Sequence, residues 1–182
     1  MEKTEEKVCE IIKKRTTIRS FIKKEIPQEL LDEILQVVQS CPTAGNLQGF
    51  KVYVVKKQEI KKKLSESAWS QKHVLEADVV LVFFAYPQRS SKKYGQRGQN
   101  LYCYQDATIA CSYAQIAAHA LGLSSGWVGA FNDDEIKKIC NAEDELIPVA
   151  MLPLGYVDPE SKKKAEEKGK SRLPQEEIVH FL

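Results

Sequence analysis

The chain has 182 residues, which suits a single domain that buries its own core without a metal or a disulfide. Lysine and arginine total 27 against 25 aspartate and glutamate, so the net charge of +2 gives no support for nucleic acid or an acidic membrane as a partner. The cysteines number five and form no C-x-x-C pair, which argues against a zinc or dithiol site and favours reduced thiols.

The N-terminal residues are charged where a secretory signal would be apolar, so we expect a cytoplasmic protein. The spacing of apolar residues predicts a first helix that ends near Arg15 and a second that runs from Pro27 to Ser40. Residues 51–57 are typical of a strand and residues 58–67 of a polar helix. Residues 77–86, which are apolar apart from Asp78 and Tyr86, predict a strand buried on both faces.

Residues 107–121 are apolar almost all round, which predicts a helix without a solvent face, part of it covered by another subunit. Polar residues interrupt this stretch, so it does not indicate a membrane span. Asn132 with Glu135 three residues later predicts a capped helix start, and residues 149–156 predict a last strand. Charged residues 158–171 are typical of a solvated linker before an apolar tail.

Arginine-bearing segments near both ends of the chain carry donors that suit a phosphate. The first reads Arg15-Thr16-Thr17-Ile18-Arg19 at a predicted helix end, and the second reads Lys170-Ser171-Arg172. Guanidinium groups are permanently charged and forked, and a threonine hydroxyl adds a neutral donor. A solvated basic surface is the alternative interpretation of such a charge run.

Glycine-containing segments lie between these two. Residues 42–46 read Pro-Thr-Ala-Gly-Asn, which is typical of a turn and also of a backbone that a flat ring can approach closely. Residues 126–131 read Gly-Trp-Val-Gly-Ala-Phe, which fits a core strand, although the two glycines suggest a further role. Asp106 is expected to lie at the start of a helix, where its negative charge interacts favourably with the helix dipole.

With these four segments, the chain resembles the nitroreductase family of FMN-dependent oxidoreductases from about residue 11 onward. The resemblance implies an α+β fold, with a mixed, mainly antiparallel sheet flanked by helices. It implies one domain over residues 1–182 that forms a domain-swapped homodimer, with residues 158–182 as a linker and an arm that packs on the partner subunit. FMN would lie at the subunit interface.

The resemblance also implies roles for individual residues. Four groups would contact FMN: the phosphate contacts Arg15, Thr16, Thr17, Arg19, Lys170 and Arg172; the ring and ribityl contacts Pro42, Thr43, Ala44 and Asn46; the pyrimidine-edge residues Gln71 and Lys72, which could equally form a solvated loop; and the backbone of Gly129 and Ala130, near N5 and O4. The histidines share no metal-ligand spacing, so no metal is expected, and the flavin rather than a side chain would carry the chemistry.

The implied activity is hydride transfer from NAD(P)H through flavin N5 to a small organic acceptor of the nitroaromatic or quinone type, with ping-pong kinetics. Two alternatives remain open: a specialised flavoenzyme for reductive dehalogenation or flavin fragmentation, and a flavin-binding or sensory protein without turnover. Residues 87–103 are short and basic where larger family members carry longer helical insertions, so the substrate is not defined by the sequence. Their cations could attract an anionic substrate or remain in water.

Overall fold

The computed structural model describes residues 2–167 and 171–182. Its helices and strands, in chain order, are α1 (Glu2–Lys14), α2 (Gln28–Gln39), η1 (Ala44–Asn46), β1 (Phe50–Val55), α3 (Gln58–Ser67), α4 (Lys72–Glu76), β2 (Val79–Ala85), α5 (Pro87–Arg97), η2 (Gly98–Tyr102), α6 (Cys103–Ala120), β3 (Ser124–Ser125), α7 (Asp133–Cys140), β4 (Ile147–Gly155), α8 (Pro159–Glu167) and η3 (Gln175–Glu177). Within the described residues, no helix combines the length and the apolar character needed to cross a bilayer.

A four-stranded sheet forms the centre, with the strand order β1-β2-β4-β3 and antiparallel neighbours throughout. A parallel contact occurs as an isolated bridge between Thr17 and Ser125 at the sheet edge. The predicted α+β fold with a mainly antiparallel sheet is confirmed. Residues 126–131, which could have formed a strand, make only an isolated bridge between Val128 and Met151. The neighbouring strand β3 is limited to Ser124 and Ser125.

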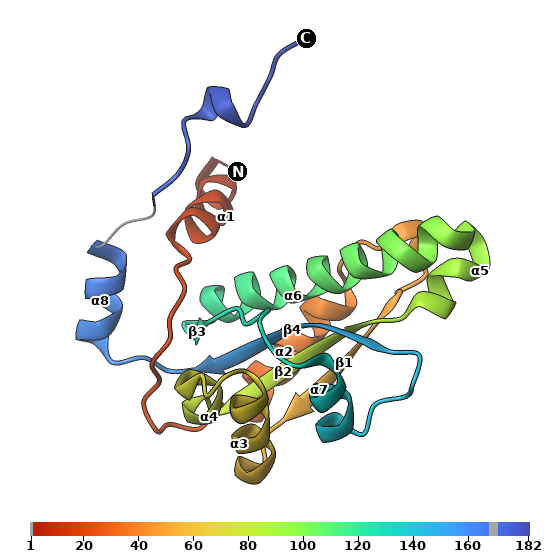
Figure 1. The fold of residues 1–182 in the computed structure, drawn as a ribbon. Coiled ribbons are helices and arrows are strands. Elements are labelled where there is room, and N and C mark those ends of the chain that lie inside the picture. Colours follow the sequence, from red (N-terminus) through yellow and green to blue (C-terminus); the bar gives the residue numbers. More distant parts are fainter. Residues whose placement is uncertain (1, 168–170) are drawn as a thin grey trace.

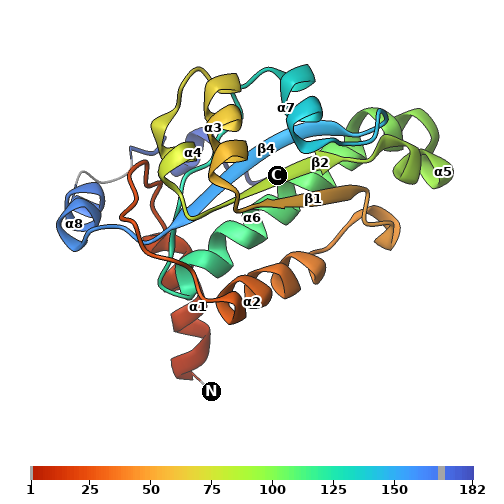
Figure 2. The same cartoon turned by 90° about the horizontal axis from the view of Figure 1, so that it is seen from below.

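Helices cover both faces of the sheet (Figures 1 and 2). Side chains alternate along β2, so Leu81 and Phe83 pack with residues of α2 and α6, whereas Val82 and Phe84 pack with residues of α3 and α7. Every residue of β2 is buried, as the apolar composition of this stretch predicted. Asn132 caps α7 by accepting a hydrogen bond from the amide of Glu135 at 3.1 Å, so the predicted cap is also confirmed.

Besides the short helix α4, two longer helices were not anticipated. Residues 159–167, part of the predicted linker, form the helix α8, whose residues are not buried and which carries an exposed pair between Lys163 and Glu167. Residues 87–102, predicted only as a short basic cover, form α5 and the π-helical turn η2. Both segments lack a regular apolar stripe, which is the signal that identifies a packed helix.

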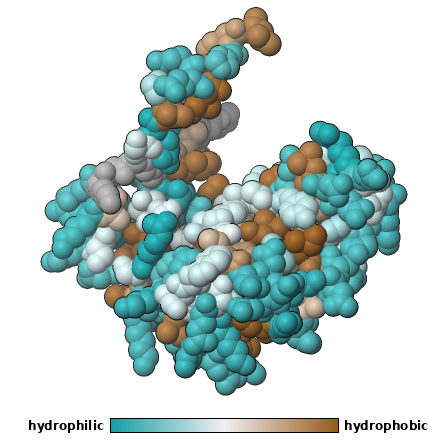
Figure 3. Space-filling model, viewed as in Figure 1, coloured by the Kyte–Doolittle hydropathy of each residue, from teal (hydrophilic) through white to brown (hydrophobic). Residues whose placement is uncertain are grey.

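The C-terminal arm, residues 171–182, extends away from the rest of the chain (Figure 1). Its apolar side chains are uncovered: Ile178 is 63% exposed and Phe181 is 89% exposed. Figure 3 shows hydrophobic, brown atoms at the tip of the arm. The helix α6 also keeps an uncovered side, because Tyr113 is exposed while Ile109 and Ile116 are half-buried. The sequence predicted that another subunit covers part of this helix, and in a single chain that part is left open.

Candidate functional site

Among the described residues, those predicted to bind a phosphate lie beyond the C-terminal end of α6. The chain that leaves α1 runs along β3, with the amide of Ile18 donating to the carbonyl of Ser125 at 2.9 Å. Arg15 follows directly after α1, and Arg172 of the arm lies near enough for its charge to act on Arg15. Segments from both ends of the sequence therefore lie near each other at this position.

Arg15 carries the clearest sign of a missing partner. Its Nη1 atom is buried and has no hydrogen-bond partner in the described part of the chain. Burial, and then the nearby charge of Arg172, lower the pKa of Arg15. None of the ion pairs between described residues involves Arg15, Arg19 or Arg172. A buried donor beside a second cation, without a carboxylate, suits an anion such as a phosphate.

The segment after β3 offers further backbone donors. Gly129 and Ala130 are exposed, and no hydrogen bond from either amide is found among the described residues. The Gln71 side chain donates to the carbonyl of Ala130 at 3.3 Å, so Gln71 belongs to this group. Lys72 is exposed at the start of α4, and the described part of the chain shows no hydrogen bond between Lys72 and Ala130.

His73 is a further candidate that the sequence analysis did not assign. It is 4% exposed, and its Nε2 atom has no partner within the described residues. Burial is the main cause that lowers the pKa of His73, and the charge of Arg19 lowers it further, while Glu76 raises it. A β-carbon added to Gly126 would lie 3.4 Å from the His73 ring, which places the ring beside the glycine segment. A single histidine has no spacing pattern that would reveal this position.

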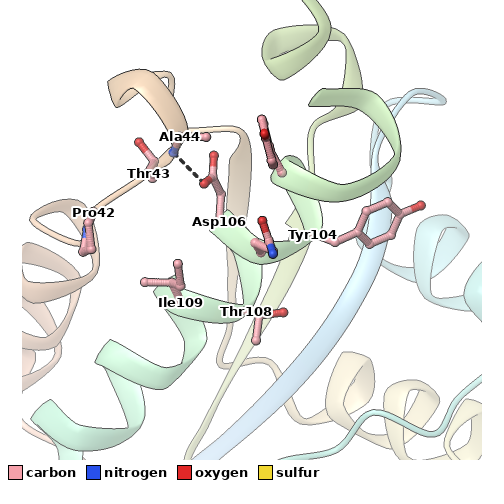
Figure 4. A pocket seen from close by; sticks show the side chains of 9 residues that line it. Pro42, Thr43, Ala44, Tyr104, Asp106, Thr108 and Ile109 are labelled. Carbon is pink, nitrogen blue, oxygen red and sulfur yellow. Dashed lines mark hydrogen bonds between the residues drawn. The ribbon is translucent and has the colours of Figure 1, made fainter. Parts of the chain in front are cut away.

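The predicted ring contacts lie at the other end of α6. Pro42, Thr43 and Ala44 line a cavity of about 630 Å³. The remaining lining residues are Tyr102, Tyr104, Gln105, Asp106, Thr108 and Ile109. Figure 4 shows Asp106 reaching from α6 to the amide of Ala44, with Pro42 and Ile109 on the same side of the cavity. Asn46 lies in the same loop at the end of η1.

The segment of residues 87–102 covers this loop. A β-carbon on Gly45 would lie 2.4 Å from the Tyr94 hydroxyl, so the two approach closely. The Tyr94 ring packs edge-on against Tyr102, with the centroids 5.1 Å apart. Arg89 donates to the carbonyl of Gln48 at 2.7 Å. Tyr102 and Tyr104 line the cavity, whereas Tyr94 lies against the loop at Gly45.

The two groups of predicted residues are therefore separated within one chain. Thr17 pairs with Ser125 just beyond Ala120, the last residue of α6, whereas Ala44 bonds to Asp106 in its first turn. An α-helix rises 1.5 Å per residue, so Asp106 and Ala120 lie about 21 Å apart. Figure 1 shows β3 at one end of α6 and α5 at the other. Lys170 lies outside the described residues.

Comparisons with known proteins agree on one family. The model of the nitroreductase family matches residues 12–77 and 67–156. The chain is 30% identical to an NADH dehydrogenase of Thermus thermophilus, over 91% of each chain, and 32% identical to an NAD(P)H FMN reductase of Bacillus subtilis, over 94% of this chain and 73% of that protein. A solved structure described as a hypothetical oxidoreductase, YcnD of Bacillus subtilis, is similar with a TM-score of 0.84 at 30% identity, over 95% of this chain and 72% of the other.

Proposed function

Because this chain belongs to the nitroreductase family, we propose that it works as a homodimer in which both subunits complete each FMN site. The chain is an FMN-dependent NAD(P)H oxidoreductase. The observation that carries the dimer is the division of the predicted site: the arginines lie at one end of α6 and the loop of residues 42–46 at the other. A second copy can bring its loop to the arginine end of the first.

Uncovered apolar surface supports the same arrangement. Tyr113, Ile109 and Ile116 lie on the open side of α6, and the arm presents Ile178 and Phe181 to solvent. Residues of this kind are stabilised by contact with another apolar surface, and burial contributes about 25 cal/mol for each Å² removed from water. We place the arm on the partner subunit, within the single domain formed by residues 1–182.

FMN supplies the redox chemistry, accepting a hydride from NAD(P)H and passing electrons to the acceptor. In the proposed site, Arg15, Arg19 and Arg172, together with Thr16, Thr17 and Lys170, neutralise a phosphate that carries a charge of roughly −1.5 to −2. The amides of Gly129 and Ala130 donate toward the ring edge where negative charge develops on reduction. Gln71 and Lys72 lie at the pyrimidine edge, and Pro42, Thr43, Ala44 and Asn46 lie along the ring.

The acceptor is a small nitroaromatic or quinone that uses the same space as the nicotinamide, which gives ping-pong kinetics. The cavity beside Pro42 and Ile109 has apolar and aromatic walls, which suits a flat acceptor. The chain contains no G-x-G-x-x-G segment after a strand, so a separate dinucleotide fold is not expected.

Absorption spectra of the purified protein test this function directly. The wild type should show bound oxidised flavin that bleaches when NADPH or NADH is added without oxygen and regains its colour when a quinone follows. Steady-state rates at several fixed quinone concentrations should give parallel double-reciprocal lines. Flavin that stays oxidised with either nucleotide would contradict the enzymatic function, and intersecting lines would contradict the shared site.

A further inference from the structure

Asp106 ties both ends of the loop of residues 44–49 to α6. The side chain is 1% exposed and lies in the first turn of the helix. Its Oδ1 atom accepts a hydrogen bond from the amide of Ala44 at 2.9 Å, and its Oδ2 atom accepts one from the amide of Gly49 at 3.1 Å. The carboxylate therefore accepts hydrogen bonds from loop amides that are distant in sequence. The sequence had suggested instead that Asp106 acts on the start of its own helix.

The conformation of the loop requires support from outside. Gly45, Asn46 and Gln48 have φ values of 57°, 58° and 46°, in the left-handed region that residues other than glycine rarely adopt. Such conformations persist where surrounding contacts determine them. Within the loop, the amide of Gln48 donates to the Thr43 hydroxyl at 3.1 Å. From outside, the loop is held by Asp106 and by Arg89.

A carboxylate is the side chain that this position requires. It offers an acceptor oxygen to each of two N–H groups, whereas an amide side chain replaces one oxygen with a donor that would face an N–H. Burial raises the pKa of Asp106, and the two backbone donors oppose that rise. A buried carboxylate loses its hydration, a cost that an apolar residue at the same position would not carry. We therefore expect a carboxylate at this position because its hydrogen-bond geometry is needed.

Gly49 shows how closely the backbone approaches this carboxylate. A β-carbon at Gly49 would lie 2.2 Å from the hydroxyl oxygen of Ser90 and 2.8 Å from Oδ2 of Asp106. Both distances are shorter than atoms tolerate, so a larger residue would push the loop away from α6. The contact thus joins α5, α6 and the loop at one point.

We propose that Asp106 is a positioning residue for the flavin site, which fixes the loop of residues 42–49 in the conformation that faces the flavin ring. Pro42, Thr43, Ala44 and Asn46 then present a preformed surface instead of being ordered on binding. The proposal rests on the proposed function for the ligand that the loop meets. The hydrogen bonds to the loop are independent of that ligand.

The test is Asp106→Asn, with Asp78→Asn as the matched control. Asp78 also accepts a long-range backbone hydrogen bond, from the amide of Ile26 at 2.8 Å, but it lies outside both groups of predicted site residues. In the FMN-free protein, amide hydrogen exchange of Ala44 and Gly49 should be at least about tenfold faster in Asp106→Asn and unchanged in Asp78→Asn. The dissociation constant of FMN should rise about tenfold, as expected for loss of one charge-assisted hydrogen bond.

A second variant approaches the same contact from the loop. Gly49→Ala should accelerate exchange at Ala44 and weaken FMN binding, and Ser90→Gly in the same chain should restore part of both by making room for the methyl group. Wild-type exchange at Ala44 in folded Asp106→Asn or Gly49→Ala, together with an unchanged FMN affinity, would overturn the positioning role. A wild-type protein that binds no FMN would instead overturn the proposed function, and the exchange of the FMN-free protein would still decide the role of Asp106.

Discussion

Replacing Arg15 by methionine should weaken FMN binding without harming the fold. Methionine keeps an apolar stem of similar length but removes the charge and the donors. The buried Nη1 of Arg15 has no partner in the described part of the protein, so its hydrogen-bonding capacity is available to a ligand. A hydrogen bond to a charged group contributes about 1.5–3 kcal/mol, which corresponds to a rise of roughly 10- to 150-fold in the dissociation constant of FMN.

In the ligand-free protein, the same substitution should not lower the free energy of unfolding and should even raise it slightly. An unsatisfied buried donor costs about 1–3 kcal/mol, and the neighbouring charge of Arg172 adds repulsion. The Arg15 side chain is only partly buried, so solvent screening reduces both effects. The free energy of unfolding of ligand-free Arg15→Met should therefore equal that of the wild type or exceed it by up to about 1 kcal/mol.

Fluorescence titrations with FMN and riboflavin, together with urea unfolding of the ligand-free protein, measure both quantities. The loss of affinity should be large for FMN and small for riboflavin, which lacks the phosphate. Lys14→Met is the matched control, because Lys14 is adjacent, exposed and paired with Glu10 at 2.9 Å. Wild-type affinity for FMN in Arg15→Met, or an equal loss for both flavins, would refute the assignment of Arg15 to the phosphate.

Two further predictions concern the arm and His73. Deleting residues 175–182 should shift the protein toward monomer in analytical ultracentrifugation and release FMN in parallel, since the arm carries uncovered apolar side chains; a truncated dimer that retains FMN would contradict this. Burial lowers the pKa of His73 below its ordinary value. As the pH falls below about 6.5, the unfolded state therefore binds a proton before the folded state does, and the free energy of unfolding should decrease as the pH decreases. His73→Gln should flatten this pH dependence in urea unfolding at several pH values, and an unchanged slope would exclude His73 as its source.

Local signals explain which parts of the fold could be predicted. The cap at Asn132 depends on residues three positions apart, and the burial of β2 follows from an uncharged run between polar flanks. The helix α8 was missed because its charged composition is shared by solvated linkers and exposed helices. In α5, Gly95 adopts a φ of 53° and interrupts the helical pattern, which conceals the helix from a periodicity argument.

Local signals also explain which residues of the candidate site could be predicted from the sequence. The arginine motif could be identified because its donors lie within a few consecutive residues. Asp106 was interpreted only as a helix-dipole residue, since its partners Ala44 and Gly49 lie 62 and 57 residues away in the sequence. His73 was not assigned because its unpartnered nitrogen exists only once the fold buries it.

The distance between the two ends of α6 couples flavin binding to subunit association. If FMN bridges the arginines of one chain and the loop of residues 42–49 of another, it binds the assembled pair more tightly than separate chains. Linkage then requires the reverse as well: each flavin strengthens association by the same factor by which association strengthens flavin binding. Dilution would release cofactor, and the supply of flavin in the cell would set how much of the chain is assembled. FMN would thus act as an assembly ligand as well as an electron carrier.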